Sequence, residues 1–314
     1  MLAYTLKRLL AGLVTVFFIA TATFAAMHAV PGDPLTTGKA RSPEIRANLK
    51  ARYGLDKPVL VQYGVFLENM AKGDFGISFT QQNRSVNDII REHFPVSAIL
   101  GVLSLLFATV GGIVLGSVTA RFRGRWADRT TLFFVVLGIS VPGFVFAALA
   151  QFGVLAVNRR AGATVLPVAG WGTFRHMLLP ALALGIGTLA FLTRLMRSSL
   201  LEIVNQDYIR TAKAKGLPPW RIFVSHQLRN GILPVITLLG PALAAITTGG
   251  FVVESVFAIP GLGRYFVQAV QQLDYTVIMG LTVFYGAFLV LMVILVDIVY
   301  GFVDPRIRVA KEGG

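Results

Sequence analysis

The chain has 314 residues, of which 55% are hydrophobic and only 14% are charged. This charged fraction is far below that of soluble domains, so the composition excludes an ordinary water-soluble protein and favours an integral membrane protein. The net charge of +14 does not indicate a nucleic-acid-binding protein, because the basic residues cluster at the ends of apolar runs rather than on one face. The chain has no cysteine, so disulfides and thiolate metal sites are excluded.

Six stretches of the chain contain no Asp, Glu, Lys or Arg and are long enough, or nearly so, to cross a bilayer. About 20 apolar residues span a hydrocarbon core of about 30 Å, and lipid offers no partner to an unpaired backbone group, so each span must be helical. We therefore expect an all-α integral membrane protein with six transmembrane helices. The stretches are Leu9–Met27, Val96–Ala120, Thr130–Val157, Met177–Thr193, Gly231–Val253 and Tyr275–Val296. The fourth is the shortest, and we expect it to extend over residues 173–201.

The basic residues between the spans predict the orientation of the chain. Lys7 and Arg8, the loop 121–129, the segment 194–229 and the tail after Arg306 all fall on one side of the six spans. Because short cytoplasmic loops carry an excess of Lys and Arg, both termini are expected in the cytoplasm.

The long segment between the first two spans has the pattern of a small folded unit. Ser42-Pro43-Glu44 predicts the start of a short helix that ends at Gly54, and a second helix is expected after Pro58. Residues Ser85–Phe94 predict a third helix that leads into the second span. The expected organisation is an N-terminal segment with the first helix (residues 1–30), a small helical extracytoplasmic subdomain (31–95) and a five-helix core (96–314) with a cytoplasmic loop at about 200–231.

Proline, glycine and one carboxylate near the membrane suggest where a pathway could run. Gly112 and Gly116 form a small-residue pair that favours close helix packing. Pro142 and Gly249 lie inside predicted spans, where they indicate either kinks around a pathway or ordinary bends. Glu254 follows the fifth span, and ionisable groups near the membrane are candidates for function, with helix-end pairing as the alternative. Glu254, Pro142 and Gly249 are thus candidates for a translocation route.

The sequence contains no recognisable catalytic or nucleotide-binding motif. The nearest string to a phosphate-binding loop, Gly32–Ala40, has the wrong glycine spacing and ends in Ala where a hydroxyl is needed. The four histidines are far apart and lack metal-binding spacing, so we expect no metal site. A membrane protein without visible chemistry of its own must receive its energy from elsewhere.

Residues 207–234 are the best candidate for the place where that energy arrives. Residues 207–215 predict a short helix, and Gly216 occupies the position after it that favours a left-handed residue. A Leu-Pro-Pro turn follows, and Pro219 or Trp220 opens a second helix that runs into the fifth span. The helix displays Arg210, Lys213 and Lys215 to the cytoplasm. From this pattern alone the segment is either a force-transmitting element or a solvated basic loop.

The same residues resemble the variant EAA loop in permease subunits of bacterial ABC importers. In the general E-A-A-x-x-x-G pattern, Ala212 and Gly216 match, whereas Arg210 and Thr211 occupy the glutamate and first alanine positions. The distal I-x-L-P would fall on residues 226–229, where only Leu228 is kept. These departures resemble the oligopeptide/dipeptide branch of the family.

The similarity to this branch extends over nearly the whole chain. The run 85–88 followed by 94–97 resembles oligopeptide permeases more than dipeptide permeases. The other matching motifs, in this order and spacing, are Pro31–Pro34, Gly54–Pro58, Gly73–Gly76, Leu195–Ser199, Glu254–Gly263 and Val303–Arg308.

The resemblance implies a type I ABC importer permease fold and a function. It implies a multi-pass permease subunit of an ATP-driven oligopeptide importer in the bacterial cytoplasmic membrane, forming half of the pathway with a homologous permease. Two cytoplasmic ATPase subunits would bind ATP and Mg, and an extracytoplasmic peptide-binding protein would deliver the substrate. The chain itself would bind no cofactor and would not be an enzyme. The ATPase-coupling residues it implies are Asp207, Tyr208, Arg210, Thr211, Ala212, Lys213 and Gly216.

Other functions remain open at this stage. Within the same branch, the chain could serve a dipeptide, nickel or glutathione importer. From a different class, a secondary transporter that works alone or an intramembrane hydrolase is the alternative.

Overall fold

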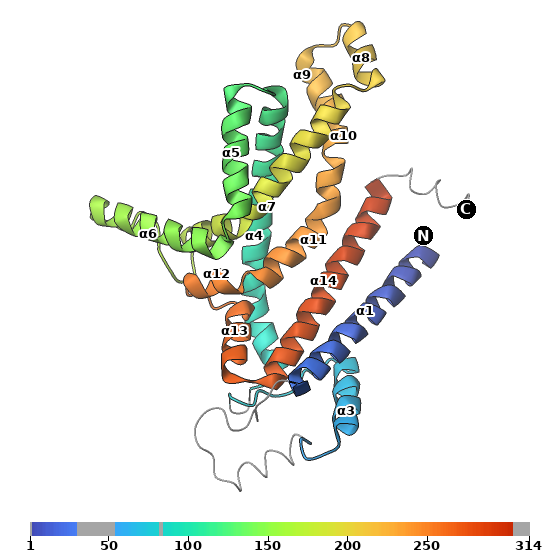
Figure 1. Cartoon of the computed structure of the whole chain (residues 1–314), viewed down its shortest axis with the longest axis vertical. Helices are drawn as coiled ribbons and strands as arrows, with labels where there is room; N and C mark the ends of the chain where they lie inside the picture. The colour runs from blue at the N-terminus through green and yellow to red at the C-terminus, as the bar shows by residue number, and fades with distance from the viewer. Residues whose placement is uncertain (1, 30–53, 82–83, 304–314) are drawn as a thin grey trace. The chain divides into compact units, whose positions relative to one another are not determined.

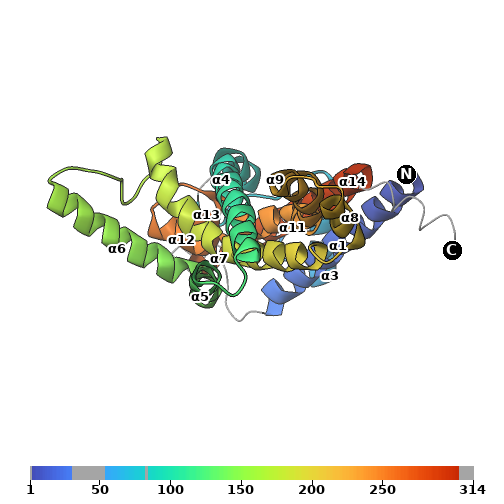
Figure 2. The same ribbon diagram turned by 90° about the horizontal axis from the view of Figure 1, so that it is seen from above.

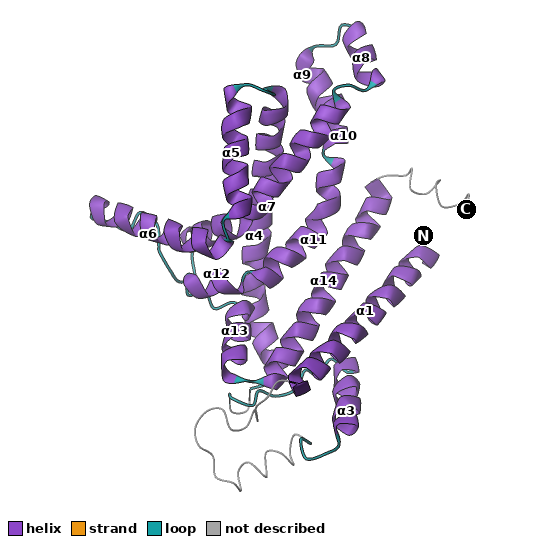
Figure 3. Ribbon diagram, viewed as in Figure 1, coloured by secondary structure: helices purple, strands orange, loops and turns teal. Residues whose placement is uncertain are grey.

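The computed structural model describes residues 2–29, 54–81 and 84–303, and in these ranges the protein is helical (Figure 1). Figure 3 shows no strand in the described part of the chain, where the strand-type pairing is an isolated bridge between Ile77 and Ser85. The predicted all-α class is confirmed. The helices are α1 (Leu2–Ala29), α3 (Val59–Ala71), α4 (Val86–Arg121), α5 (Trp126–Ser140), α6 (Gly143–Ala161), α7 (Phe174–Ile203), α8 (Asp207–Ala214), α9 (Pro219–Ile222), the π-helix η1 (Phe223–Leu228), α10 (Arg229–Gly231), α11 (Leu233–Gly249), α12 (Phe251–Val256), α13 (Leu262–Gln272) and α14 (Tyr275–Val303).

Helix length and composition account for six membrane spans among the described residues. Helices α1, α4, α7 and α14 are each long and apolar enough to cross a membrane. Two further pairs pass the same test together but are bent: α5 and α6 by 110°, and residues 219–231 and α11 by 44°. When each bent pair is counted as one span, the total is the predicted six. The expected extension of the fourth span is also confirmed, because α7 covers Phe174–Ile203.

The third predicted span, residues 130–157, consists of two helices, and the bend expected at Pro142 is a sharp break of 110°. Helix α5 ends at Ser140 and α6 begins at Gly143. Between them Val141 is extended, with φ −90° and ψ 122°, and Pro142 precedes the first turn of α6. Pro142 has no N–H to continue the hydrogen bonds of α5, and it disfavours helical geometry in the residue before it. These two effects of the proline together end α5 and turn the chain sharply.

The contacts within the chain divide it into two compact units. Unit 1 combines residues 1–97 with 260–294, and unit 2 combines 98–259 with 295–314. Helices α4 and α14 contribute residues to both units. The predicted boundaries at residues 30/31 and 95/96 describe the course of the chain across a membrane, and they stay a prediction.

A buried carboxylate organises unit 1. Asp274 is 1% exposed and lies directly before α14. Its Oδ1 accepts hydrogen bonds from the backbone N–H groups of Val277 (3.3 Å) and Phe79 (3.1 Å). Its Oδ2 accepts them from the backbone N–H and the hydroxyl of Thr80 and from the hydroxyl of Ser78. One side chain therefore caps α14 and holds the 78–80 loop against it.

Two of the three helices predicted between the first two spans are present in the described residues. Helix α3 follows Pro58, and its Tyr63 hydroxyl lies 2.7 Å from the Thr21 hydroxyl of α1. The helix predicted at Ser85–Phe94 exists as the first part of α4, which runs on through Pro95 into the second span. The helix predicted from Ser42 to Gly54 lies outside the described residues.

Close contact between α4 and α7 forms part of the centre of unit 2. A Cβ placed on Gly112 would lie 2.7 Å from Cβ of Leu192, and one on Gly116 would lie 2.6 Å from Cβ of Met196. Both distances are shorter than any real contact, so only glycine permits this approach, as predicted for the pair. Helices α4, α5 and α7 lie side by side in both views (Figures 1 and 2).

We expect Asp274→Ala to lower the free energy of unfolding by about 3 kcal/mol, because the substitution removes a helix cap and leaves buried donors unpaired. Thermal unfolding of the purified protein in detergent measures this loss. Asp56→Ala, at an exposed position in the same unit, is the matched control. Equal midpoints for the two variants would contradict the role of Asp274.

Candidate functional site

The predicted coupling region forms an ordered element between α7 and α11. It consists of α8, a tight turn at Gly216, α9, the π-helix η1 and α10. We call residues 207–231 the coupling segment. Figure 1 shows α8 and α9 beyond the end of α7, at the end of unit 2 that also carries the turn between α4 and α5. The second helix is predicted from the sequence to begin at Pro219 or Trp220, and it begins at Pro219.

Gly216 ends α8 with the predicted left-handed geometry. Its φ is +72°. The Gly216 N–H donates to the Lys213 carbonyl (3.0 Å), and the Leu217 N–H donates to the Ala212 carbonyl (3.3 Å). These two bonds form a Schellman motif, which satisfies carbonyls that the helix end leaves open. A Cβ at Gly216 would meet no atom within 4 Å, so glycine is required here by backbone conformation and not by lack of space.

The coupling segment has a small hydrophobic core of its own. Ile209 is fully buried, and Ala212 and Ile222 are 5% and 4% exposed. Ile203, at the end of α7, and Leu217 pack against them. Because these apolar contacts join α8, α9 and α7, the segment is a packed unit and not a solvated loop. Ala212, which the resemblance implies as a coupling residue, faces this core and serves packing.

The opposite face of α8 is polar and exposed. Asp207, Tyr208, Arg210, Thr211 and Lys213 are all exposed. The Arg210 side chain is 74% exposed, and its Nη1 lies 3.7 Å from Oδ1 of Asp207. An ion pair this exposed contributes little to stability. These side chains are therefore available to a partner, and their contact with an ATPase stays a prediction.

Asn230 holds the coupling segment together, and Gly231 packs it against α7. Asn230 Nδ2 donates to the Tyr208 hydroxyl (3.2 Å) and to the His226 carbonyl (3.0 Å), which ties α8 to α10. Gly231 is buried, and a Cβ there would lie only 2.8 Å from Cδ2 of Leu200 in α7. The coupling segment therefore contacts α7 through side chains as well as through the chain.

Trp220 is a candidate that the sequence pattern identified only as a helix start. It lies in the first turn of α9 with 73% of its surface exposed, and its ring centroid is 6.1 Å from that of Phe223. Trp and Tyr are enriched among the residues that dominate binding at protein interfaces, so Trp220 is a candidate contact for a partner. The sequence pattern carries no signal for the exposure of this side chain.

The three candidates for a translocation route lie on separate elements of unit 2. Glu254 is in α12 and is 1% exposed, so it is buried rather than interfacial as expected from the span end. Pro142 lies at the sharp break between α5 and α6. Gly249 is the last residue of α11, and a Cβ there would meet no atom within 4 Å. Their part in transport stays a prediction.

Within the described residues, no group of three or more His, Asp or Glu side chains is placed to hold a metal ion. The coupling segment has no nucleophile–base pair in its hydrogen bonds either; its polar contacts are caps and ties between helices. The chemistry that this arrangement supports is recognition and mechanical attachment.

Comparison with known proteins gives a consistent result along the chain. Residues 112–309 match the family model described as the binding-protein-dependent transport system inner membrane component. Residues 1–101 match the model of the N-terminal part of such membrane components. The dipeptide transport system permease protein DppB of Bacillus subtilis is 45% identical over 315 residues, with 100% of each chain covered. The oligopeptide transport system permease protein OppB of Haemophilus influenzae is 43% identical over 311 residues, covering 98% of this chain and 100% of the relative.

Solved structures support the fold. A chain of the MetNI methionine ABC transporter in an inward-facing conformation has a TM-score of 0.52 at 18% identity, covering 69% of this chain and 96% of that one. A chain of an amino acid ABC transporter has a TM-score of 0.50 at 13% identity, covering 70% and 94%. The arrangement of helices is therefore that of type I ABC importer permeases, as predicted.

Gly216→Leu is expected to destabilise the end of α8 by about 1–2 kcal/mol, because a residue with a Cβ is strained at positive φ. Hydrogen exchange over residues 205–222 should then be faster than in the wild-type protein. Gly153→Leu, at an exposed helical site of α6 where a Cβ meets no atom within 4 Å, should leave this exchange unchanged. Identical protection in both variants would rule out the left-handed cap as the device that orders the segment.

Proposed function

The chain belongs to the family of binding-protein-dependent transport system inner membrane components, and from this we propose that it is the transmembrane permease subunit of an ATP-driven oligopeptide importer. The full-length match to permeases named for oligopeptides and dipeptides supports the proposal. In this function the chain lies in the bacterial cytoplasmic membrane with both termini inside. It forms half of the pathway together with a homologous permease.

The partners follow from the absence of an energy source in the sequence. Two cytoplasmic ATPase subunits bind and hydrolyse ATP with Mg, while this chain binds no cofactor and catalyses no reaction. An extracytoplasmic peptide-binding protein presents the substrate to the outer face, where we expect residues 31–95 because the short basic loops are predicted on the cytoplasmic side. A dipeptide importer is the second candidate function, because the relative from Bacillus subtilis is named a dipeptide permease.

The observation that carries the coupling proposal is the two-sided character of the coupling segment. One side, around Ile209 and Ile222, is buried in a core shared with α7. The other side presents Tyr208 (41% exposed), Arg210 (74%) and Trp220 (73%). Tyr, Trp and Arg are the residue types that most often dominate the energetics of protein interfaces. We propose that this outer face binds a cytoplasmic ATPase subunit.

The geometry also provides a route for the motion. When the ATPase pair closes on ATP, a docked α8 moves with it. The motion reaches α7 through the Ile203 contact with the segment core and the Gly231–Leu200 contact. Protein interiors are close-packed and transmit displacement rather than absorb it, so the spans move and the site opens alternately to each side.

Transport by the assembled complex tests the function. Vesicles that contain this chain, a homologous permease and both ATPases, supplied with the binding protein, should take up a labelled oligopeptide only when ATP is inside the compartment that holds the ATPases. Competition by unlabelled dipeptides and by longer peptides distinguishes the two candidate substrates. Uptake by this chain alone, driven by an ion gradient, would show a secondary transporter and overturn the proposal.

Trp220→Ala should weaken binding of the ATPase subunits to the permease by about tenfold or more, because an exposed tryptophan at a protein interface is commonly an energetic anchor. Surface plasmon resonance with the permease in nanodiscs measures the affinity. Trp126→Ala is the matched control, since Trp126 is 79% exposed at the start of α5 and lies outside the coupling segment. Unchanged affinity for the Trp220 variant would indicate that this residue faces the membrane surface instead.

A further inference from the structure

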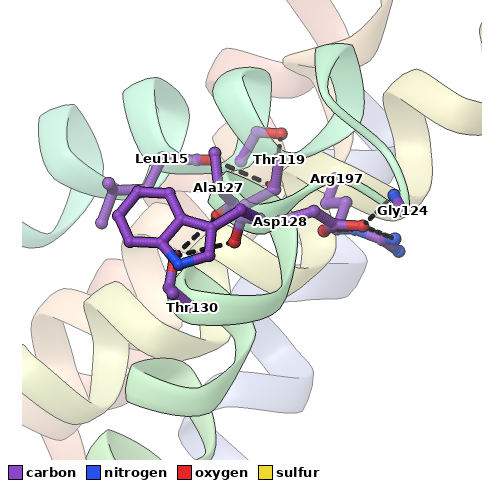
Figure 4. Close-up of polar contacts among 9 residues, drawn as sticks. Leu115, Thr119, Gly124, Ala127, Asp128, Thr130 and Arg197 are labelled. Atoms are coloured by element: carbon purple, nitrogen blue, oxygen red, sulfur yellow. Dashed lines mark hydrogen bonds and ion pairs between the residues drawn. The ribbon is translucent and has the colours of Figure 1, made fainter.

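Asp128 and Arg197 form a buried ion pair between α5 and α7. Arg197 Nε donates to Oδ1 of Asp128 (2.8 Å), and Arg197 Nη2 donates to Oδ2 (2.9 Å). The backbone N–H of Gly124 donates to the same Oδ2 (2.8 Å). Figure 4 shows the carboxylate held between the guanidinium and the Gly124 backbone. Asp128 is 3% exposed, so its charge is almost fully removed from water.

Asp128 pairs with Arg197 of α7 although several arginines lie closer to it in the sequence. Residues 121–129, which include the α4–α5 turn and the helix ends beside it and are here called the α4–α5 turn, carry Arg121, Arg123, Arg125 and Arg129, and all four are exposed. Asp128 is the single acidic residue of the turn, yet it pairs with a guanidinium from another helix. A two-pronged arginine–carboxylate pair is directional, because both N–H···O bonds must be aligned at once. The pair therefore fixes the position of the turn relative to α7.

Apolar packing in this region does not fix that position by itself. Gly138 of α5 brings its backbone close to Ala190 of α7, where a Cβ on the glycine would lie 3.2 Å from Cβ of the alanine. Such contacts hold helices together but are non-directional, so they resist separation more than sliding. The ion pair supplies the resistance to sliding at the end where the coupling segment begins.

Arg197 is also close to the coupling segment along α7. Leu200, one turn further on, lies against Gly231. Ile203, two turns further on, packs on the core of the coupling segment. The ion pair therefore lies between these two contacts and the apolar middle of α7.

We propose that Asp128 and Arg197 are positioning residues that lock the α4–α5 turn to α7, so that motion of the coupling segment moves α4, α5 and α7 as one body. This role rests on the proposed function as an ATP-driven permease. In this role the pair acts through helix position and not through contact with substrate or nucleotide. Its removal should separate ATP hydrolysis from transport rather than abolish hydrolysis.

Asp128→Asn in the assembled complex tests the role. The variant keeps the shape of the side chain but loses its charge. Uptake per ATP hydrolysed should fall about tenfold, which is within the range expected for residues that couple two sites. The rate of ATP hydrolysis should change about twofold at most. Exchange of the two residues, Asp128→Arg with Arg197→Asp, should recover part of the lost ratio. Arg194→Lys, exposed on the same helix, should behave as the wild-type complex.

A distance measurement makes the test independent of transport. The chain has no cysteine, so spin labels can be placed on cysteines at Phe133 of α5 and Phe191 of α7, which are 61% and 43% exposed. The distance distribution should be narrow and the same with and without nucleotide, and Asp128→Asn should broaden it. If Asp128→Asn does not assemble, Arg197→Lys is measured in its place, because lysine keeps the charge but cannot form the two-pronged pair.

The outcomes separate the two proposals. An unchanged distance distribution together with an unchanged uptake per ATP in the variant would overturn the positioning role. Hydrolysis and uptake that fall in equal proportion would also overturn it, because that result is expected of a residue that serves only stability. A wild-type complex without ATP-driven uptake would overturn the proposed function, while the distance measurement would still test the lock.

Discussion

Hydrocarbon offers no hydrogen-bond partner to a peptide group, and this constraint determines the architecture of the chain. Every backbone N–H and C=O at membrane depth must be satisfied within a helix or by protein around it. The long helices α1, α4, α7 and α14 meet the requirement internally. Where the helices break, at Val141–Pro142 and at Gly250, the breaks lie beside other elements of unit 2, because α12 contacts both α6 and α7.

Helix α7 is the element to which the rest of unit 2 is attached. Glycines of α4 and α5 let these helices approach it within backbone contact, and its final turns carry the coupling segment. The segment is stiff because it has its own core and a capped helix end, with Ile209 and Gly216 as the central residues. Force applied to an element built in this way is delivered to a close-packed helix and not lost in loop motion.

Charge is used sparingly and in two ways. At Asp274 and Asp128 the carboxylates are buried and surrounded by donors, so each joins segments that are distant in sequence. On α8 and in the α4–α5 turn the charges are exposed, where water and salt weaken them and they contribute to orientation and partner recognition rather than to stability. Burial therefore separates structural charges from those available for binding.

The sequence by itself determined the properties that depend on local patterns. Apolar run length predicted the spans, the glycine after Ala214 and Lys215 predicted the left-handed end of α8, and the order of motifs indicated the family. Only the tertiary structure decided which side chains meet across the chain: Asp128 with Arg197, Asp274 with the 78–80 loop, and the outward position of Trp220. It also decided that the third span breaks by 110° at Pro142. A one-dimensional pattern shows how strongly a residue prefers a helix or an apolar environment, but pairing and exposure depend on which helices pack together, and that is a property of the folded chain.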